Sequence, residues 1–415
     1  MLVYEYKLDG NKAQYRAIDE AIRTVQFIRN KCLRLWMDER GISKNDLQCS
    51  CAELAKAYPF AARLNSQARQ ASADRTWFAI SRFYDNCKQH TPGKKGFPQF
   101  QHDNRSVEYK QTGWKLEPDG SHITFTDGCQ IGRLRLVGTR DIETFPVKKI
   151  KRVRIVRRAD GYFCQFCVQT DRQVEHIPTG VMRGIDVGLK SYYTDSEGLT
   201  VENPRQYRKA EKKLKQLHRR FSRTAKKSQN RKKARKQVAK GYLKVQRQRE
   251  DFARKCANTL VTSSDFIAYE DLKIANMVRN RKLAKSIHDA GWGAFIRKVQ
   301  AYGAMHHVPV IGVPPQYTSQ DCSACGTRVK KTLSMRTHIC PGCGVVLDRD
   351  HNAACVRRFG AYKISLMKRD EAERKWPQGR LTYLAGKPKG ENSMSWKAVK
   401  QEGMYCDVPQ VLYAW

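Results

Sequence analysis

The chain has 415 residues, and its 79 lysines and arginines outnumber its 40 aspartates and glutamates to give a formal net charge of +39. This length predicts roughly two to three domains, each with its own apolar core. So strong a positive charge predicts a polyanionic partner, and we expect nucleic acid because its phosphates match that charge density. A membrane surface is the weaker alternative, because the chain has no run of 18 apolar residues and no segment typical of a signal peptide. The 14 cysteines fit a reducing cytosol, since four of them have the spacing of metal ligands.

The N-terminal part predicts a strand-rich domain with a helical insertion. Residues 3–8 alternate as in a strand, whereas residues 12–36 and 66–88 have apolar side chains at helical spacing. From residue 91 to about 170 the chain contains short alternating segments separated by turn residues, which predicts a small barrel or sandwich. We expect the first strand to join that sheet, so that the helices between them form an insertion.

Two surfaces of this part are candidates for contact with nucleic acid. The polar side of the helix at 66–88 carries Gln70 and several charged residues; such a side is usually solvated but can also face DNA. The strand predicted at 148–158 is basic and can bind phosphates. Cys164 and Cys167 also have the spacing of a ligand pair. They lie in an alternating run without a second pair nearby, so we interpret them as strand residues, with metal binding as the minority alternative.

A second domain is predicted to begin at about residue 181. An apolar strand at 182–188 contains one carboxylate, Asp186, and a second apolar strand at 266–269 leads into Glu270. A carboxylate on a buried strand is costly unless a cation or a ligand compensates it. Asp186 therefore predicts a compensating partner.

Between these two strands lies a strongly basic segment. Of the 51 residues from 205 to 255, 22 are lysine or arginine. A narrow apolar stripe predicts two long helices, broken near residues 224–229. Because the segment has few acids, most of its cations are expected to face phosphate or solvent. Further along we expect a polar loop to residue 285, a helix from about residue 289 and a buried strand at 308–313.

Two cysteine pairs follow. They are Cys322-Ser-Ala-Cys325 and Cys340-Pro-Gly-Cys343, separated by fourteen residues. Each pair is followed by a glycine, Gly326 or Gly344, where a metal knuckle bends back. This spacing predicts tetrahedral zinc bound by four thiolates, in preference to four cysteines that only pack.

A third candidate acid comes directly after the cysteines. Asp350 lies in the run Asp348-Arg-Asp-His-Asn-Ala-Ala354, near the start of a predicted helix. Together with Asp186 and Glu270 it suggests a magnesium site that acts on phosphodiesters. Residue types and spacing leave open whether the three acids converge.

Five motifs stand between residues 181 and 358: Gly184-Ile-Asp-Val-Gly-Leu-Lys190, Tyr269-Glu-Asp-Leu272, Asp289-Ala-Gly-Trp-Gly293, Tyr317-Thr-Ser-Gln-Asp-Cys322 with the four cysteines, and Asp348-Arg-Asp-His-Asn-Ala-Ala354. Together they resemble the TnpB (OrfB) family, transposon-encoded RNA-guided nucleases related to type V CRISPR effectors. The resemblance is looser over residues 1–180, where Gly96-Phe-Pro-Gln-Phe100 is the best match, and it is absent from the tail.

The resemblance implies an α+β multidomain chain. Its expected parts are a β-barrel-like wedge domain at 1–11 and 91–180, a helical recognition insertion at 12–90, a RuvC-like (RNase H-like) α/β domain at 181–320 and 346–360, an inserted four-cysteine zinc ribbon at 321–345, and a flexible tail at 361–415. The motifs assign Asp186, Glu270 and Asp350 as the catalytic acids and magnesium ligands. Asp348 is the rival for the third place.

The resemblance also implies the activity and its partners. We expect a metal-dependent DNA endonuclease of a transposon, with catalytic Mg²⁺, structural Zn²⁺ on Cys322, Cys325, Cys340 and Cys343, and one guide RNA bound to a monomeric chain. Base pairing with the guide selects a double-stranded DNA target, while the protein reads a short adjacent motif, to which Gln70 contributes. We expect a prokaryotic cytoplasmic protein associated with the nucleoid. The alternatives are a compact type V CRISPR effector and a non-cleaving RNA-guided regulator.

Overall fold

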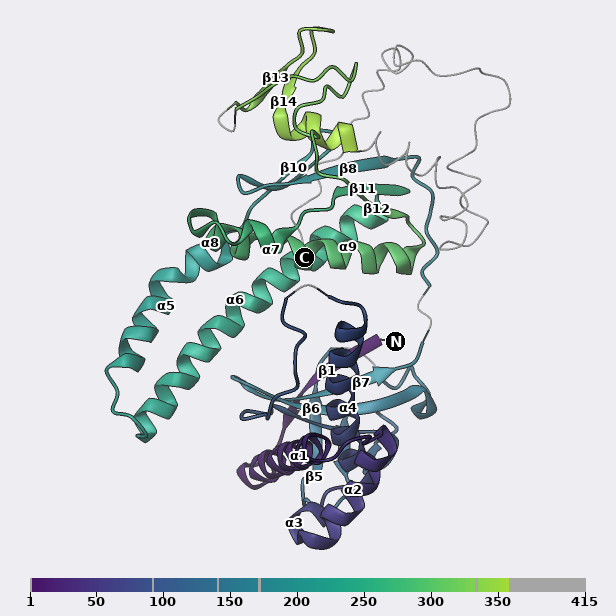
Figure 1. Cartoon of the computed structure of the whole chain (residues 1–415), viewed down its shortest axis with the longest axis vertical. Helices are drawn as coiled ribbons and strands as arrows, with labels where there is room; N and C mark the ends of the chain where they lie inside the picture. The colour runs from purple at the N-terminus through teal and green to yellow at the C-terminus, as the bar shows by residue number, and fades with distance from the viewer. Residues whose placement is uncertain (1, 92, 140–141, 171–172, 333–334, 358–415) are drawn as a thin grey trace. The chain divides into compact units, whose positions relative to one another are not determined.

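The computed structural model of the protein describes residues 2–91, 93–139, 142–170, 173–332 and 335–357. The tail predicted at 361–415 lies outside the described residues. The chain divides into two compact units, residues 1–172 and 173–415. Each unit combines helices with a sheet, so the α+β class is confirmed (Figure 1).

The first unit is built on a seven-stranded sheet in the order β2-β6-β7-β1-β5-β4-β3. Its strands are β1 (Leu2–Asp9), β2 (Ser106–Tyr109), β3 (Trp114–Leu116), β4 (His122–Phe125), β5 (Gly132–Val137), β6 (Ile150–Arg158) and β7 (Gly161–Val168), with a short 3-10 helix, η1 (Val147–Lys149), before β6. Every pair of neighbours runs antiparallel. β1 lies between β7 and β5, because its alternation directs Tyr6 and Leu8 into the core. Cys164 and Cys167 are strand residues of β7, as expected.

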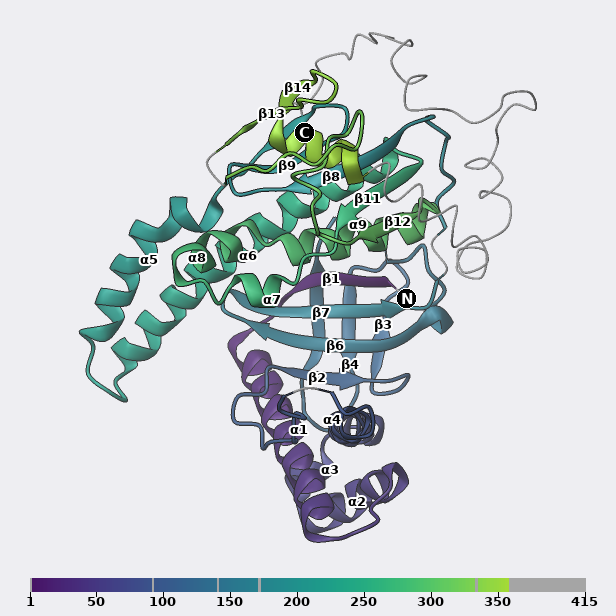
Figure 2. The same cartoon turned by 45° about the horizontal axis from the view of Figure 1, so that its top comes forward.

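Four helices are inserted between β1 and β2 and pack on this sheet (Figure 2). They are α1 (Lys12–Asp38), α2 (Lys44–Ala57), α3 (Pro59–Ala62) and α4 (Ser66–Lys88). Helix α1 begins at a capping box in which Asn11 and Gln14 satisfy each other's backbone N–H groups. Ile18, Ile22 and Ile28 of its apolar stripe are fully buried.

The second unit contains a five-stranded sheet in the order β10-β9-β8-β11-β12. Its strands are β8 (Met182–Val187), β9 (Ser191–Asp195), β10 (Thr200–Glu202), β11 (Phe266–Glu270) and β12 (Val310–Val313). The three strands β8 to β10 pair antiparallel, whereas β11 pairs parallel with both β8 and β12. A two-stranded sheet of β13 (Thr337–Ile339) and β14 (Val346–Asp348) follows. Residues 349–357 are helical.

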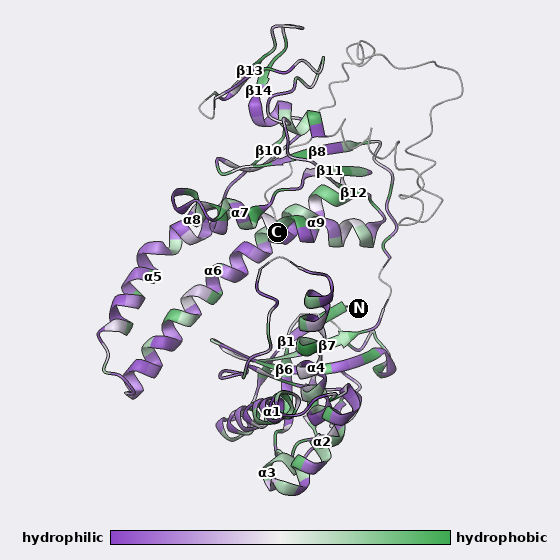
Figure 3. Ribbon diagram, viewed as in Figure 1, coloured by the Kyte–Doolittle hydropathy of each residue, from purple (hydrophilic) through white to green (hydrophobic). Residues whose placement is uncertain are grey.

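The helices of the second unit are α5 (Gln206–Ser222), α6 (Gln229–Thr262), α7 (Ile274–Met277), α8 (Arg281–Ala290) and α9 (Trp292–His306). The C-terminal part of α6 and helix α9 bury Leu260, Phe295 and Val299 against β8 and β9. Helices α5 and α6 form the expected basic hairpin, and most of their length is hydrophilic (Figure 3). Among the described residues, no helix has the length and apolar character needed to cross a membrane.

One prediction between the two parallel strands is wrong. Residues 281–290 form helix α8 instead of a polar loop, and the next helix begins at Trp292 instead of near Asp289. Gly291 separates the two helices in the left-handed conformation, with φ 68°. Only Ile287, Asp289 and Ala290 of α8 are buried, and one of these three is charged, so its apolar side is too short to be recognised from the sequence.

Candidate active site

Asp186 and Glu270 lie on adjacent parallel strands. Strand β8 pairs with β11 so that Ile185 is opposite Tyr269, and the next residue of each strand is the acid. The two side chains are only 13% and 12% exposed. The hydrophobic pattern around each acid forces the strand into the sheet, and the register then brings the two carboxylates to the same edge.

A buried arginine joins the two acids. Arg357 Nη1 lies 2.6 Å from Asp186 Oδ1, and Arg357 Nη2 lies 2.8 Å from Glu270 Oε2. The side chain of Arg357 is 2% exposed, and Nη1 also donates to the carbonyl of Ile185 at 3.3 Å. The hydroxyl of Thr318 donates to the other oxygen of Glu270 at 3.3 Å. The two carboxylates therefore share one guanidinium.

The charge at this edge is under-compensated. Burial raises the pKa of Asp186 to about 6; the guanidinium of Arg357 opposes this rise, and the carboxylates of Asp350 and Glu270 add to it. The three predicted acids thus lie within electrostatic reach of one another. Asp186 and Glu270 share a single cation, so this pair keeps an excess of negative charge, which attracts a further cation.

Asp350 stands in the first turn of the helix at 349–357. Its side chain is 18% exposed and lies 3.4 Å from Arg349 and 3.7 Å from Arg336. Asp348, the rival acid, has another use: its Oδ1 accepts the backbone N–H of Asp350 at 2.8 Å and thereby caps this helix. A capping carboxylate is held at the helix start, whereas Asp350 extends from the helix.

The position of Asp350 relative to the strands follows from Gly188. A Cβ built on Gly188 would lie 4.0 Å from Asp350 Oδ2 and 3.1 Å from the carbonyl of Ser191. The loop after β8 therefore approaches the third acid closely. Carboxylate oxygens are the ligands that Mg²⁺ prefers, and the guanidinium between Asp186 and Glu270 already stands where a cation is favourable, so the chemistry of these two acids suits a divalent cation.

The four cysteines are brought together. Within the part of the chain that the structure describes, their sulfurs form the one group of metal-ligating side chains whose ligand atoms all lie within 4.8 Å of one another. Cys322 Sγ lies 3.7 Å from Cys343 Sγ, and Cys325 Sγ lies 3.4 Å from Cys340 Sγ. A tetrahedron with Zn–S bonds of about 2.3 Å has edges of about 3.8 Å, so the cluster is compatible with zinc.

Two matching turns build this cluster. The N–H of Gly326 donates to the carbonyl of Cys322, and the N–H of Gly344 donates to the carbonyl of Cys340, both at 2.9 Å. Both glycines have positive φ, 78° and 73°, which side-chain-bearing residues rarely adopt. The repeated turn explains why glycine follows each pair.

Asn352 connects the cysteine cluster to the third acid. Its Oδ1 accepts the N–H of Ser323 at 2.9 Å, and its Nδ2 donates to the carbonyl of Asp321 at 2.8 Å. Asn352 is fully buried and lies two residues beyond Asp350 in the same helix. The first cysteine turn therefore holds the helix that carries Asp350.

Gln70 belongs to a different part of the molecule. It is half-buried on α4 in the first unit, whereas the three predicted acids belong to the second unit. The polar side of α4 is less solvated than expected, because Asp74 is 6% exposed and Arg75 binds Glu108 at 3.1 Å. Gln70 stays a prediction as a contact to DNA.

Sequence reasoning missed Arg357 and the partners of the basic strand β6. Arg152 and Arg154 of β6 bind Glu108, and Arg157 binds Asp19 at 3.0 Å. Much of the strand expected to bind phosphates is thus already paired within the protein. A four-residue strand such as β2, which carries Glu108, is too short to show a clear alternation.

Two protein-family models match parts of this chain that contain these residues. The "Probable transposase" model OrfB_IS605 matches residues 165–281, which include Asp186 and Glu270. The "Cas12f1-like, TNB domain" model matches residues 292–356, which include the four cysteines and Asp350. Residues 165–281 are therefore similar to the OrfB_IS605 transposase family, and residues 292–356 are similar to the Cas12f1-like TNB domain.

Proteins similar to parts of this chain occur in bacteria and in a giant virus. A Streptomyces pristinaespiralis protein named "Putative RNA-guided DNA endonuclease" is 37% identical over 173 residues, which are 41% of this chain and 43% of that protein. An Escherichia coli K12 protein of the same name, with the suffix InsQ, is 26% identical over 279 residues, which are 63% of this chain and 67% of that protein. A TnpB-like protein of Acanthamoeba polyphaga mimivirus is 26% identical over 31% of this chain and 25% of its own length. The chain thus spans less than half the length of the Streptomyces relative.

One solved structure aligns with most of this chain. The structure "Cryo-EM structure of the Cas12f1-sgRNA-target DNA complex" aligns with a TM-score of 0.48 and 13% sequence identity over 83% of this chain and 81% of that chain.

Proposed function

We propose that this protein is an RNA-guided DNA endonuclease of a transposon. The observation that carries the proposal is the pair of buried carboxylates of Asp186 and Glu270, which share one guanidinium at one sheet edge within electrostatic reach of Asp350, in a strongly basic chain. Asp186 and Glu270 have one guanidinium between them, whereas the structural cluster of Glu108 in the first unit has three arginines for one acid. An acid-rich group on a basic protein suits the chemistry of phosphodiester cleavage.

The finer architecture is part of the proposal. We assign residues 1–11 and 91–180 to a wedge domain, 12–90 to its recognition insertion, 181–320 and 346–360 to a RuvC-like domain, and 321–345 to a zinc ribbon. The sheet order β10-β9-β8-β11-β12 supports the third assignment, because three antiparallel strands followed by two parallel ones are typical of the RNase H fold. The two cysteine turns support the fourth.

Each residue of the site has a role in this mechanism. Asp186, Glu270 and Asp350 would hold Mg²⁺, which when bound activates water and stabilises the leaving oxygen of the phosphodiester. Arg357 keeps the two strand carboxylates at one edge, and Thr318 orients Glu270. The four cysteines, with structural Zn²⁺, fix the first turn that Asn352 joins to the helix of Asp350, so their contribution is to position the third acid.

The partners follow from the charge and from the similarity to known families. We assign the chain one guide RNA and a double-stranded DNA target, in the cytoplasm of a prokaryote and associated with the nucleoid. The basic hairpin of α5 and α6 supports binding to a polyanion, because most of its cations are exposed. Gln70 is our candidate for reading an adenine beside the target, since a carboxamide can bind that base edge through two hydrogen bonds.

The test is cleavage by purified protein. The RNA that copurifies is sequenced, a duplex matching its guide segment is supplied, and cutting is measured with and without Mg²⁺ for the wild type and for Asp186→Asn. We expect magnesium-dependent cutting of the matched duplex by the wild type only. Protein that carries no RNA and cuts no matched duplex contradicts the proposal.

One observation favours a second function. The guanidinium of Arg357 stands between Asp186 and Glu270, and a permanent cation there would favour a non-cleaving RNA-guided regulator. In that case the wild type and the Asp186→Asn variant would bind the matched duplex equally well, and neither protein would cut it. A compact CRISPR effector is the alternative in origin, which the match to a Cas12f1-like model favours; a neighbouring repeat array, instead of a noncoding RNA at the end of the gene, would identify it.

A further inference from the structure

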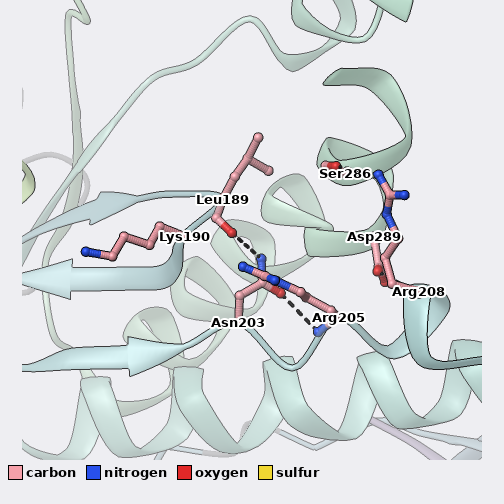
Figure 4. Close-up of a pocket in the computed structure, with 7 residues that line it drawn as sticks. All are labelled: Leu189, Lys190, Asn203, Arg205, Arg208, Ser286 and Asp289. Carbon is pink, nitrogen blue, oxygen red and sulfur yellow. Dashed lines mark hydrogen bonds between the residues drawn. The ribbon is translucent and has the colours of Figure 1, made fainter. Parts of the chain in front are cut away.

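A cavity of about 470 Å³ lies in the second unit. It is lined by Leu189, Lys190, Asn203, Arg205, Arg208, Ser286 and Asp289 (Figure 4). Three of these side chains are cations and one is an anion. The lining comes from the loop after β8, the start of α5 and the end of α8, which are distant in sequence.

The single anion of this cavity is already used. Asp289 is 7% exposed, and its two oxygens accept the backbone N–H groups of Tyr207 at 2.8 Å and Arg208 at 3.1 Å. The carboxylate thereby satisfies the N-terminal amides of α5 and neutralises the positive end of that helix. Any attraction of the cavity for anions therefore comes from its arginine side chains and not from the helix end.

The arginine side chains lack acidic partners. Within the described ranges, Arg205 forms no side-chain ion pair, and Arg208 has one contact, a 3.1 Å hydrogen bond from Nη2 to the hydroxyl of Ser286. Figure 4 shows the two side chains diverging from the start of α5, Arg205 toward Leu189 and Arg208 toward Ser286. Lys190 is exposed and extends away from Arg208 in this view. Two guanidinium groups thus flank the cavity with unused donors.

The side chain of Asn203 holds this arrangement in place. Asn203 Nδ2 donates to the carbonyl of Leu189 at 3.2 Å, and Asn203 Oδ1 accepts the N–H of Arg205 at 3.2 Å (Figure 4). The loop after β8 and the start of α5 are therefore tied together. Arg205 itself adopts the left-handed conformation, with φ 48° and ψ 47°, which an arginine rarely does.

The cavity adjoins the acids through one residue. Leu189 directly follows Gly188, whose Cβ position would lie 4.0 Å from Asp350 Oδ2 and whose carbonyl accepts the indole N–H of Trp292 at 3.3 Å. A strand of nucleic acid with one phosphodiester at the acids can place a neighbouring phosphate on the other side of this loop.

We propose that the cavity is a phosphate-binding subsite, in which Arg205 and Arg208 bind a backbone phosphate of the DNA strand that is being cut. The inference rests on the proposed nuclease function. Arginine donates paired hydrogen bonds to phosphate oxygens, and contacts to the backbone fix the register of a strand without reading its sequence. The subsite determines which phosphodiester reaches Asp186, Glu270 and Asp350.

The experiment measures binding in a form of the protein that cannot cut. RNA-loaded Asp186→Asn protein is titrated with a fluorescent single-stranded DNA that does not match its guide, at several salt concentrations. Adding Arg205→Ala and Arg208→Ala to this protein should weaken DNA binding about threefold to tenfold at low salt. The salt slope, which is the change in log binding constant with log salt concentration, should fall in magnitude by about 0.7, the value for one lost phosphate contact on a single strand. Lysine at both positions should retain part of the affinity.

The control removes the same charge elsewhere. Arg105 and Arg133 of the first unit are paired with Asp103 at 3.1 Å and Glu117 at 2.6 Å, so their double alanine variant should keep the wild-type salt slope. Equal slopes for the cavity variant and this control overturn the proposal. Loss of the copurified RNA from the cavity variant also overturns it, because the cavity then binds the guide.

The two proposals can fail separately. In the cleavage-competent protein, the cavity variant should cut a matched duplex at displaced positions or with a higher KM. If the wild type cuts the matched duplex and the cavity variant keeps the wild-type salt slope, only the subsite proposal is refuted. A protein that cuts no DNA but shows the arginine-dependent slope refutes the nuclease function and leaves the subsite as a DNA contact.

Discussion

The two units of the protein treat buried acids in opposite ways. In the first unit, Glu108 is 4% exposed and binds Arg75, Arg152 and Arg154 at 2.6–3.1 Å. In the second, Asp186 and Glu270 share the single guanidinium of Arg357. Three cations surround one acid in the first case, and one cation serves two acids in the second.

The pKa values of Glu108 and Asp186 shift in opposite directions, in keeping with this difference. Burial opposes ionisation of Glu108, but Arg75 and Arg154 outweigh it and hold the pKa of Glu108 below its ordinary value. Burial raises the pKa of Asp186 to about 6, and Arg357 does not offset the rise. The first cluster is satisfied without any further ligand, whereas the second has a negative excess that a divalent cation can satisfy. The comparison therefore distinguishes a structural cluster from a candidate catalytic one.

The largest expected effect concerns the metal-dependent part of the second unit. Cys343→Ser removes one of the four thiolates. Because structural zinc sites supply much of the folding free energy of small ribbons, the segment from 321 to 348 should then become sensitive to protease. Because Asn352 ties this segment to the helix of Asp350, DNA cutting should be lost. Zinc content, proteolysis and cleavage measure the outcome.

The control for the zinc prediction is Cys49→Ser, which changes an exposed cysteine of the first unit. It should leave zinc content and cleavage unchanged. The Glu108 cluster contains no metal ligands, so proteolysis within the first unit should be the same in both variants. Normal cutting by Cys343→Ser protein that contains no zinc would refute the positioning role.

The next largest effect is expected from a substitution that breaks the Glu108 cluster of the first unit. Glu108→Gln leaves three arginines without their carboxylate, and loss of one partner of a buried ion pair costs about 3–5 kcal/mol in the free energy of unfolding. Urea unfolding of the first unit measures it. Glu117→Gln, which removes the surface partner of Arg133, should change stability much less. Equal effects of the two substitutions would contradict the structural role of Glu108.

The third effect tests the under-compensated cluster through pH. The pKa of Asp186 is about 6 in the folded protein against an ordinary value of 3.8, so folding favours the protonated form. This contribution to stability is complete below about pH 4 and is lost as the pH rises through 6. Asp186→Asn mimics the protonated acid, so the variant should exceed the wild type in stability by up to about 3 kcal/mol at pH 8 and match it at pH 4.

The measurement is urea unfolding from pH 4 to 8 in buffer without added divalent cations. A variant that is less stable than the wild type at pH 8 would show that Arg357 fully compensates Asp186. The candidate site would then resemble the Glu108 cluster, and the contrast between the units would disappear.

The smallest effect concerns competition between Arg357 and Mg²⁺. Arg357→Met removes the guanidinium from the two carboxylates while keeping an apolar side chain of similar length. Mg²⁺ should then stabilise the variant by about 1 kcal/mol more than it stabilises the wild type, a difference of about 2–4 °C in Tm. Thermal unfolding with increasing Mg²⁺ checks this response. An equal response in the two proteins would mean that Arg357 and the ion do not compete.

Much of the fold follows from local patterns. The strands β1, β6 to β8, β11 and β12 and the helices α1, α4, α5 and α6 have clear periodicity and occur close to their expected places. The short strands β2, β3 and β10, with three or four residues each, were not predicted because so few residues cannot show a period of two. Helix α8 was missed because its buried side contains only three residues.

The candidate site was predictable in part. Asp186 and Glu270 interrupt or end apolar strands, and that conflict with the hydrophobic pattern marks them in the sequence. Arg357 carries no such mark, since an arginine near a predicted helix start looks like any surface cation. Its role depends on two strands that lie far from it in the chain.

The amino-acid sequence by itself determined the cation excess, the four-cysteine spacing and the acids placed on apolar strands, because each of these is a property of residue type and short-range spacing. Only the tertiary structure decided that Asp186 and Glu270 meet in register, that Arg357 joins them, and that Asp348 caps the helix of Asp350. It also placed Arg205 and Arg208 around a cavity in the second unit. The physical reason is that strand register and the pairing of buried charges depend on contacts between distant segments, whose free energies no local pattern contains.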